Sequence, residues 1–146
     1  MKAVNSTIAK FGYPATLVHE SEHWLVLARP AQVTLGSLIL AAKSDATAFG
    51  ALSGAAFAEL ATVIAAIEQG LAAFSAYERI NYLMLMMVDP HVHFHVIPRY
   101  SGSREWGGHD FLDKGWPGPP DLKSAIALSS GDISHLRDGL AEHIRG

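Results

Sequence analysis

Three histidines at alternate positions, His91, His93 and His95, are the residues whose types and spacing most clearly indicate chemistry. The chain holds eight histidines in 146 residues. Alternate side chains of a β-strand point to opposite faces, so a strand here would place the three imidazoles on one face, about 6.6–6.8 Å apart along it. The apolar residues between them would then face a core. Such a row predicts a functional site rather than a packing face.

Two chemistries use imidazoles in such a row. Neutral imidazoles two residues apart can bind one zinc, copper or iron ion. Alternatively, an imidazole nitrogen can attack phosphorus and form a covalent intermediate in phosphoryl or nucleotidyl transfer. The sequence offers one nearby carboxylate as a further metal ligand, Asp89, which is separated from the row by Pro90. The spacing alone leaves both chemistries open.

The full string favours the second chemistry. The run 91–97 reads His-Val-His-Phe-His-Val-Ile and continues into Pro98 and Arg99. This resembles the signature of the histidine triad (HIT) superfamily, in which three histidines alternate with apolar residues and Pro-Arg often follows. All seven positions match, and the chain resembles bacterial HIT-family hydrolases over about 18–99.

The resemblance implies a nucleotide hydrolase or nucleotidyl transferase that cleaves at a phosphate. It assigns the nucleophile to His93, which would form a nucleotidyl–histidine that water then hydrolyses. It implies that His95 contacts the phosphate oxygens or the leaving group, and that His91 orients His93. Substrates would be dinucleoside polyphosphates or nucleoside phosphoramidates. The cleavage step would need no metal and no cofactor, and the protein would pair as a homodimer.

Three further residues are candidates for binding substrate. Ser37 stands where many relatives carry a fourth histidine, and it can donate a hydrogen bond. Arg29 stands where relatives place an Asp or Asn that holds the ribose, and it could pair with a phosphate instead. Arg99 follows the triad and could complement phosphate charge. The Gly-Gln loop that donates to phosphate in many relatives is replaced by Asp89-Pro90.

The elements that must position these residues can be predicted from breakers and periodicity. Short aliphatic runs at 23–28 and 37–41 predict strands. Apolar residues then recur at steps of three and four, which predicts a long amphipathic helix capped by Ser53. This buried stripe comprises Phe57, Leu60, Ile64, Ile67, Leu71 and Phe74.

The second half of the chain predicts a hairpin, a loop and a helix. The run 80–88 reads as a strand buried on both faces, and 91–97 as its antiparallel partner. Glycines and prolines concentrate in 101–120, which predicts a long loop in which Trp116 could cap a pocket. Helical spacing returns at Ile133, Leu136, Leu140 and Ile144, with Asp132 as a candidate N-cap. Residues 1–20 carry only a weak signal.

These elements predict one α+β domain over 1–146. An antiparallel sheet is packed by one long helix, with a core at about 18–100 and a variable C-terminal loop and helix at 101–146. This is the order of elements in the HIT domain.

Composition narrows the class of partner. Eleven Lys and Arg stand against fourteen Asp and Glu, a formal charge of −3, so we expect no nucleic-acid partner. The absence of cysteine excludes disulfides, thiolate metal sites and cysteine nucleophiles. We see no signal peptide, and the apolar run 82–88 is far shorter than a membrane span of about 20 residues. We therefore expect a soluble, cytoplasmic protein that does not bind membranes.

The predicted function is thus a metal-independent HIT-type hydrolase or transferase acting on a small nucleotide. Two alternatives stay open at this point. The missing phosphate donors are compatible with a module that binds or senses nucleotides without turnover. The histidine row is compatible with a metal-binding protein.

Overall fold

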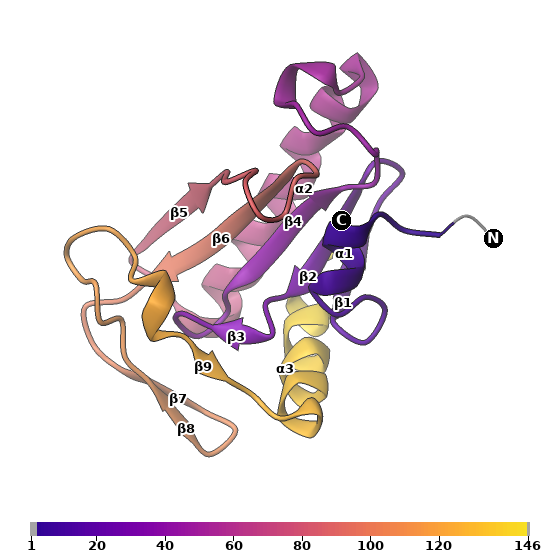
Figure 1. The fold of residues 1–146 in the computed structure, drawn as a ribbon. Coiled ribbons are helices and arrows are strands. Elements are labelled where there is room, and N and C mark those ends of the chain that lie inside the picture. The colour runs from indigo at the N-terminus through magenta and orange to yellow at the C-terminus, as the bar shows by residue number, and fades with distance from the viewer. Residues whose placement is uncertain (1–2, 146) are drawn as a thin grey trace.

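A computed structural model of the chain describes residues 3–145 and shows a five-stranded antiparallel sheet covered on one face by two helices (Figure 1). The strand order is β1-β2-β4-β6-β5, and every neighbouring pair is antiparallel. The helices are α1 (Ser6–Lys10), α2 (Gly54–Ser75) and α3 (Ser130–His143), with short 3-10 turns at Phe49–Ala51 and Leu122–Ser124. The strands are β1 (Leu17–Glu20), β2 (Trp24–Ala28), β3 (Ala31–Gln32), β4 (Leu38–Ala42), β5 (Arg79–Leu83), β6 (His93–Arg99), β7 (Arg104–Trp106), β8 (His109–Phe111) and β9 (Ile126–Ala127). The predicted α+β class is confirmed.

Each face of the sheet has its own apolar cluster, because side chains alternate along the strands. On one face, residues such as Val26, Leu40 and Val96 pack with α2 and α3 in the larger cluster, which extends from Val18 to Ile144. The other face carries the smaller cluster, in which Ile8 and Phe11 pack on Leu25, Leu27, Ile39 and Ala41. Helix α1 and the residue after it therefore cover part of the second face.

The long helix forms largely as its periodicity predicts. The Ser53 hydroxyl accepts a hydrogen bond from the amide of Ala56, which confirms the predicted N-cap. Ile67 and Leu71 are fully buried, and three further members of the stripe pack at the edge of the core. Phe57 departs from the prediction, since it is 39% exposed and packs on the ring of Phe49 outside the core.

Helix α2 is also the segment of 3–145 that is long and apolar enough to cross a membrane by length and composition alone. The expectation that the chain has no membrane span rested on the shorter apolar run 82–88. In this structure the helix contributes Val63, Ile67 and Leu71 to the larger core cluster. The core helix of a globular domain meets the same criterion, because it needs one continuous apolar face.

Three other segments differ from their predictions. Strand β5 ends at Leu83, and the following apolar residues Met87 and Val88 are 83% and 85% exposed, so the run 80–88 is neither one strand nor buried on both faces. The region 101–120 contains the hairpin β7–β8, where the loop was expected to be continuous. Helix α3 has the predicted buried residues, but its N-cap is Ser129 rather than Asp132.

Candidate active site

Strand β6 lies between β4 and β5 and carries the histidine row. His93 is paired with Ala41, and His95 is paired with Ile39 on one side and Leu83 on the other. Both rings contact Phe11, with ring centroids 5.8 Å away in each case. The structure thus places these two imidazoles on the face that α1 covers, with Val92 and Val96 buried in the opposite core. His91 precedes the strand, so only two of the three imidazoles belong to the predicted row within β6.

The His93 ring is held in one orientation by the main chain. Its Nδ1 lies 2.7 Å from the carbonyl oxygen of His91. A carbonyl oxygen only accepts, so Nδ1 of a neutral His93 carries the proton and Nε2 presents its lone pair. That Nε2 is buried, and it is the only buried side-chain nitrogen or oxygen within 3–145 without a hydrogen-bond partner. The arrangement leaves a free, unprotonated imidazole nitrogen of the kind a nucleophile requires.

His95 is held as a neutral imidazole. Burial, followed by the nearby Arg29 and His93, lowers the pKa of His95 to about 4. Arg29 Nε donates to His95 Nδ1 over a long contact of 3.4 Å. Because a guanidinium cannot accept, Nδ1 is the acceptor and Nε2 of His95 carries the proton. His95 therefore offers an N–H donor beside His93, and the two ring centroids are 5.2 Å apart.

His91 is oriented from the N-terminal helix. Its Nδ1 lies 2.9 Å from the hydroxyl oxygen of Thr7, which is buried. The α1 helix is fixed to the sheet by its N-cap Asn5, whose side-chain oxygen accepts from Ile8 and whose amide donates to the carbonyl of Ser44. The contact between His91 and His93 is therefore made by the main-chain carbonyl, while the His91 ring itself contacts Thr7.

Helix α1 and Phe11 were missed by sequence analysis, although they supply much of this site. Lys10 Nζ lies 2.6 Å from a carboxylate oxygen of Asp89, so the helix is also tied to the loop that precedes the histidines. Asp89 neutralises Lys10 in this pair, which leaves Arg29 as the cation that contacts the row. The sequence does hold one signal for this helix, because Asn is a residue type that often caps a helix N-terminus and Asn5 precedes α1.

Ser37 is placed in a turn where its hydroxyl is already engaged. It donates to the carbonyl of Thr34 at 2.8 Å and accepts from the amide of Thr34 at 3.0 Å. The residue is fully buried. These bonds explain the serine as a component of the turn before β4, and the structure gives no support to its predicted contact with substrate.

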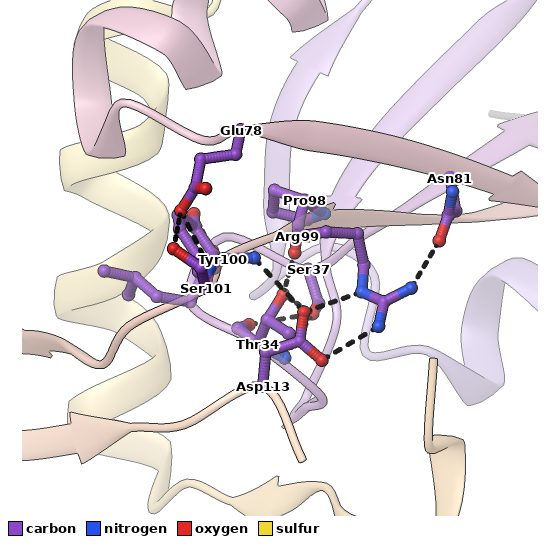
Figure 2. Close-up of polar contacts among 10 residues, drawn as sticks. Thr34, Ser37, Glu78, Asn81, Pro98, Arg99, Tyr100, Ser101 and Asp113 are labelled. Atoms are coloured by element: carbon purple, nitrogen blue, oxygen red, sulfur yellow. Dashed lines mark hydrogen bonds and ion pairs between the residues drawn. The ribbon is translucent and has the colours of Figure 1, made fainter. Parts of the chain in front are cut away.

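Arg99 lies on the same face as the histidines but is committed to an internal network (Figure 2). Its Nε and Nη2 donate to the two carboxylate oxygens of Asp113 at 2.7 and 3.0 Å. Its Nη1 donates to Asn81 Oδ1 at 2.7 Å. Arg99, which was predicted to bind phosphate, is thus held in a buried ion pair with Asp113. A carboxylate oxygen of Asp113 also accepts from the amide of Tyr100.

The geometry does not favour a metal in the histidine row. Among residues 3–145, the one set of three His, Asp or Glu side chains whose ligand atoms lie within 4.8 Å of one another is Glu22, His23 and Glu59. Glu59 is already engaged there, because its carboxylate accepts from the Ser21 hydroxyl and the His23 amide. A metal on His91, His93 and His95 would need their rings to move together.

Comparisons with solved structures found proteins with a similar architecture. A histidine triad protein from Bradyrhizobium japonicum superposes with a TM-score of 0.74 at 19% identity, covering 98% of each chain. A hypothetical histidine triad nucleotide-binding protein from Sulfolobus tokodaii gives 0.69 at 20% identity, covering 94% of this chain and 89% of that one. The diadenosine triphosphate hydrolase of Plasmodium falciparum gives 0.65 at 9% identity, covering 90% and 77%.

The chain therefore has the fold of the histidine triad proteins, over nearly its whole length. No family model matches its sequence, and no curated protein matches it either. At identities near 20% the likeness to these structures defines the fold alone. Two of the three alternating histidines, His93 and His95, lie on strand β6.

Proposed function

We propose that this protein is a nucleotide hydrolase or nucleotidyl transferase with His93 as its nucleophile. The observation that carries the proposal is the unpartnered, buried Nε2 of His93, whose ring is held by the His91 carbonyl. A buried polar atom without a partner costs stability, and a catalytic or ligand-binding role explains why such an atom is retained. Two of the solved proteins with this fold are described as a nucleotide-binding protein and a diadenosine triphosphate hydrolase.

The chemistry follows from the protonation states. Nε2 of His93 attacks the phosphorus of a nucleotide, so that a P–N bond forms while the bond to the leaving group breaks and the leaving group takes up a proton from solvent. Nε2–H of His95 donates to a phosphate oxygen or to the leaving group. Water then attacks the same phosphorus and releases one proton to solvent, the P–N bond breaks, and a nucleoside monophosphate and free His93 result. Arg29 supplies positive charge for the phosphates, since it makes no ion pair with any of residues 3–145, whereas Asp89 already pairs with Lys10.

Access to the nucleophile requires movement. The side chain of His93 is fully buried, and the Phe11 ring is among its neighbours. A phosphorus atom can reach Nε2 only after side chains such as Phe11 shift. The short helix α1, which is held by a few polar contacts and by the packing of Ile8 on the sheet, is the segment that would shift together with Phe11.

The same burial favours a second candidate, a module that binds nucleotides without turnover. In that case the free Nε2 would serve as a hydrogen-bond acceptor for a bound ligand. This candidate predicts nucleotide binding with neither product release nor a covalent intermediate.

Turnover separates the two candidates. Wild type, His93→Ala and the matched control His19→Ala are offered adenosine and guanosine phosphoramidates and dinucleoside polyphosphates with EDTA present. The proposal predicts nucleoside monophosphate from wild type and from His19→Ala, and none from His93→Ala. Binding without turnover in all three proteins would favour the binding module, and equal turnover by His93→Ala would exclude His93 as nucleophile.

Two further expectations are proposals. We propose a homodimer, which rests on the resemblance and is tested by the measured mass in solution. We propose a cytoplasmic location, which rests on the lack of a recognisable signal peptide in the sequence. The roles of Ser37 and Arg99 as substrate ligands are not part of this proposal, since both side chains are already engaged.

A further inference from the structure

One imidazole and two carboxylates meet at the turn between β1 and β2. Glu22 and His23 belong to this turn, and Glu59 reaches it from the second turn of α2. One ligand atom of each side chain lies within 4.8 Å of the other two. Nε2 of His23 lies 3.9 Å from a carboxylate oxygen of Glu22. The cluster thus combines one nitrogen donor with oxygen donors from two segments of the chain.

The main chain around the cluster is held against both α2 and β4. The Ser21 amide donates to the carbonyl of Trp24 at 2.9 Å, and Nε1 of the fully buried Trp24 donates to the carbonyl of Ala56 at 2.8 Å. The carbonyl of His23 accepts from the amide of Lys43 at 2.9 Å. The backbone positions of the candidate ligands are therefore fixed before any ion binds.

Glu59 is oriented by two hydrogen bonds that fall on the same oxygen. Its Oε1 accepts from the Ser21 hydroxyl and from the His23 amide, the latter at 2.8 Å. Its Oε2 makes no ion pair with any of residues 3–145 and neither of these two bonds. Carboxylates that bind metals are commonly held in this way, through hydrogen bonds that leave an oxygen for the ion.

The cluster carries negative charge that no basic side chain balances. Lys43 is the nearest lysine, and its Nζ pairs with Glu20 at 2.5 Å. Within 3–145, neither Glu22 nor Glu59 forms an ion pair with a lysine or an arginine. Two ionised carboxylates beside a neutral imidazole match the charge of one divalent cation.

The donor set selects among divalent cations. Magnesium and calcium take oxygen ligands, whereas zinc binds imidazole nitrogen together with carboxylate oxygen. Tetrahedral zinc places its ligand atoms about 3.4 Å apart, so the three side chains need to approach one another by only about 1 Å. The side chain of Glu22 is 82% exposed and is free to make this movement.

We propose that Glu22, His23 and Glu59 bind a zinc ion, with water as the fourth ligand. The ion joins the β1–β2 turn to α2, which covers the face of the sheet opposite to His93 and His95. It stabilises the folded protein, since the unfolded chain does not hold the three ligands together. It takes no part in cleavage, so the inference is independent of the proposed function.

Zinc titration of single variants tests the site. The Kd for Zn²⁺ is measured by isothermal titration calorimetry at pH 7 for wild type, Glu22→Gln, His23→Gln and Glu59→Gln. We expect each variant to raise the Kd by about tenfold or more, because each loses one ligand. Glu105→Gln, at an exposed position of β7, is the matched control and should leave the Kd unchanged. His93→Ala should also bind zinc as wild type does.

Urea unfolding provides a second measurement and a check on folding. With EDTA present, the exposed Glu22→Gln and Glu105→Gln variants should unfold at the same urea concentration as wild type. Zinc in place of EDTA should raise this midpoint in wild type and Glu105→Gln but not in Glu22→Gln. A midpoint that zinc raises equally in all three proteins would overturn the site.

Two calorimetric results would also overturn the site. One is zinc binding that survives in His23→Gln and Glu59→Gln but is lost in His93→Ala, which would place the ion on the histidine row. The other is a wild-type protein that binds no zinc at concentrations up to about 100 μM. Nucleotide turnover with EDTA present tests the proposed function separately, so either claim can fail without the other.

Discussion

The His93 ring takes its orientation from the main chain of His91, whose carbonyl oxygen lies 2.7 Å from His93 Nδ1. The carbonyl belongs to the backbone and does not depend on the side chain at position 91. The first and second histidines of the row are thus linked by a bond that most substitutions at position 91 would preserve.

This relationship predicts unequal effects of two alanine substitutions. His93→Ala removes the nucleophile, so kcat/KM should fall by on the order of 10³ or more. His91→Ala keeps the carbonyl and loses only the ring that Thr7 holds, so we expect a fall of about 10–100-fold. Steady-state kinetics on a phosphoramidate measures both. Equal losses would mean that the His91 ring itself takes part in the chemistry.

Arg29 should matter for both charge and the protonation of His95. It is the largest cause of the lowered pKa of His95 after burial. Arg29→Gln removes a cation, so we expect KM for nucleotides to rise about tenfold and the pKa of His95 to move upward. Kinetics gives the first effect and NMR titration of the imidazole gives the second. Arg137→Gln, on α3, is the control and should change neither.

Protonation of His95 should destabilise the fold at acid pH. Its pKa is about 4 in the folded protein against an ordinary value of 6.5, so the unfolded chain binds this proton more readily. The contribution of neutral His95 to stability is complete above about pH 6.5 and is lost as the pH falls toward 4. It amounts to no more than about 3 kcal/mol.

Urea unfolding at pH 7 and pH 4.5 tests this effect. The free energy of unfolding of wild type should be lower at pH 4.5, and His95→Gln, which cannot titrate, should show a smaller difference between the two pH values. An identical pH dependence in wild type and variant would show that His95 is not the group responsible.

The Arg99–Asp113 pair should be a source of stability. Both side chains are at least 94% buried and share two hydrogen bonds, so Asp113→Asn leaves an uncompensated buried charge. We expect the free energy of unfolding to fall by about 3–5 kcal/mol. Asp45→Asn, an exposed counterpart, should change it by less than about 0.5 kcal/mol. Urea denaturation measures both, and equal stability of the two variants would contradict the structural role of the pair.

Strong periodicity explains which elements could be predicted. The alternation from His93 to Ile97 and the spacing of Ile67 and Leu71 each repeat over several turns or pairs, and both elements formed where expected. Helix α1 has only five residues, too few to carry a period, and it is held by tertiary contacts such as Asn5 with Ser44.

The β7–β8 hairpin was missed although its signal was present. Gly107 and Gly108 both adopt positive φ, 59° and 80°, as a two-residue hairpin turn requires, and the Gly-Gly pair stands between Trp106 and His109 in the sequence. When the glycines of 101–120 are taken only as loop composition, the region reads as a continuous loop. A Gly-Gly pair is also a sequence signal of a two-residue hairpin turn.

The residues of the candidate site also divide into those that the sequence predicts and those that only the tertiary structure reveals. The histidines could be found from their spacing, because a strand fixes the face on which they lie. The partners of Arg99 could not, since Asp113 and Asn81 meet it only through tertiary packing. Phe11 likewise reaches His93 and His95 from 82 and 84 residues away in the sequence.

The most direct test of the central claim is to trap the intermediate. Wild type and His93→Ala are mixed with adenosine 5′-phosphoramidate, quenched within the first turnovers and digested, and the peptide that contains residues 91–99 is analysed by mass spectrometry. The proposed mechanism predicts an adenylyl adduct on His93 in wild type and no adduct in the variant. An adduct on another residue, or steady turnover by wild type with no adduct at any time, would contradict it.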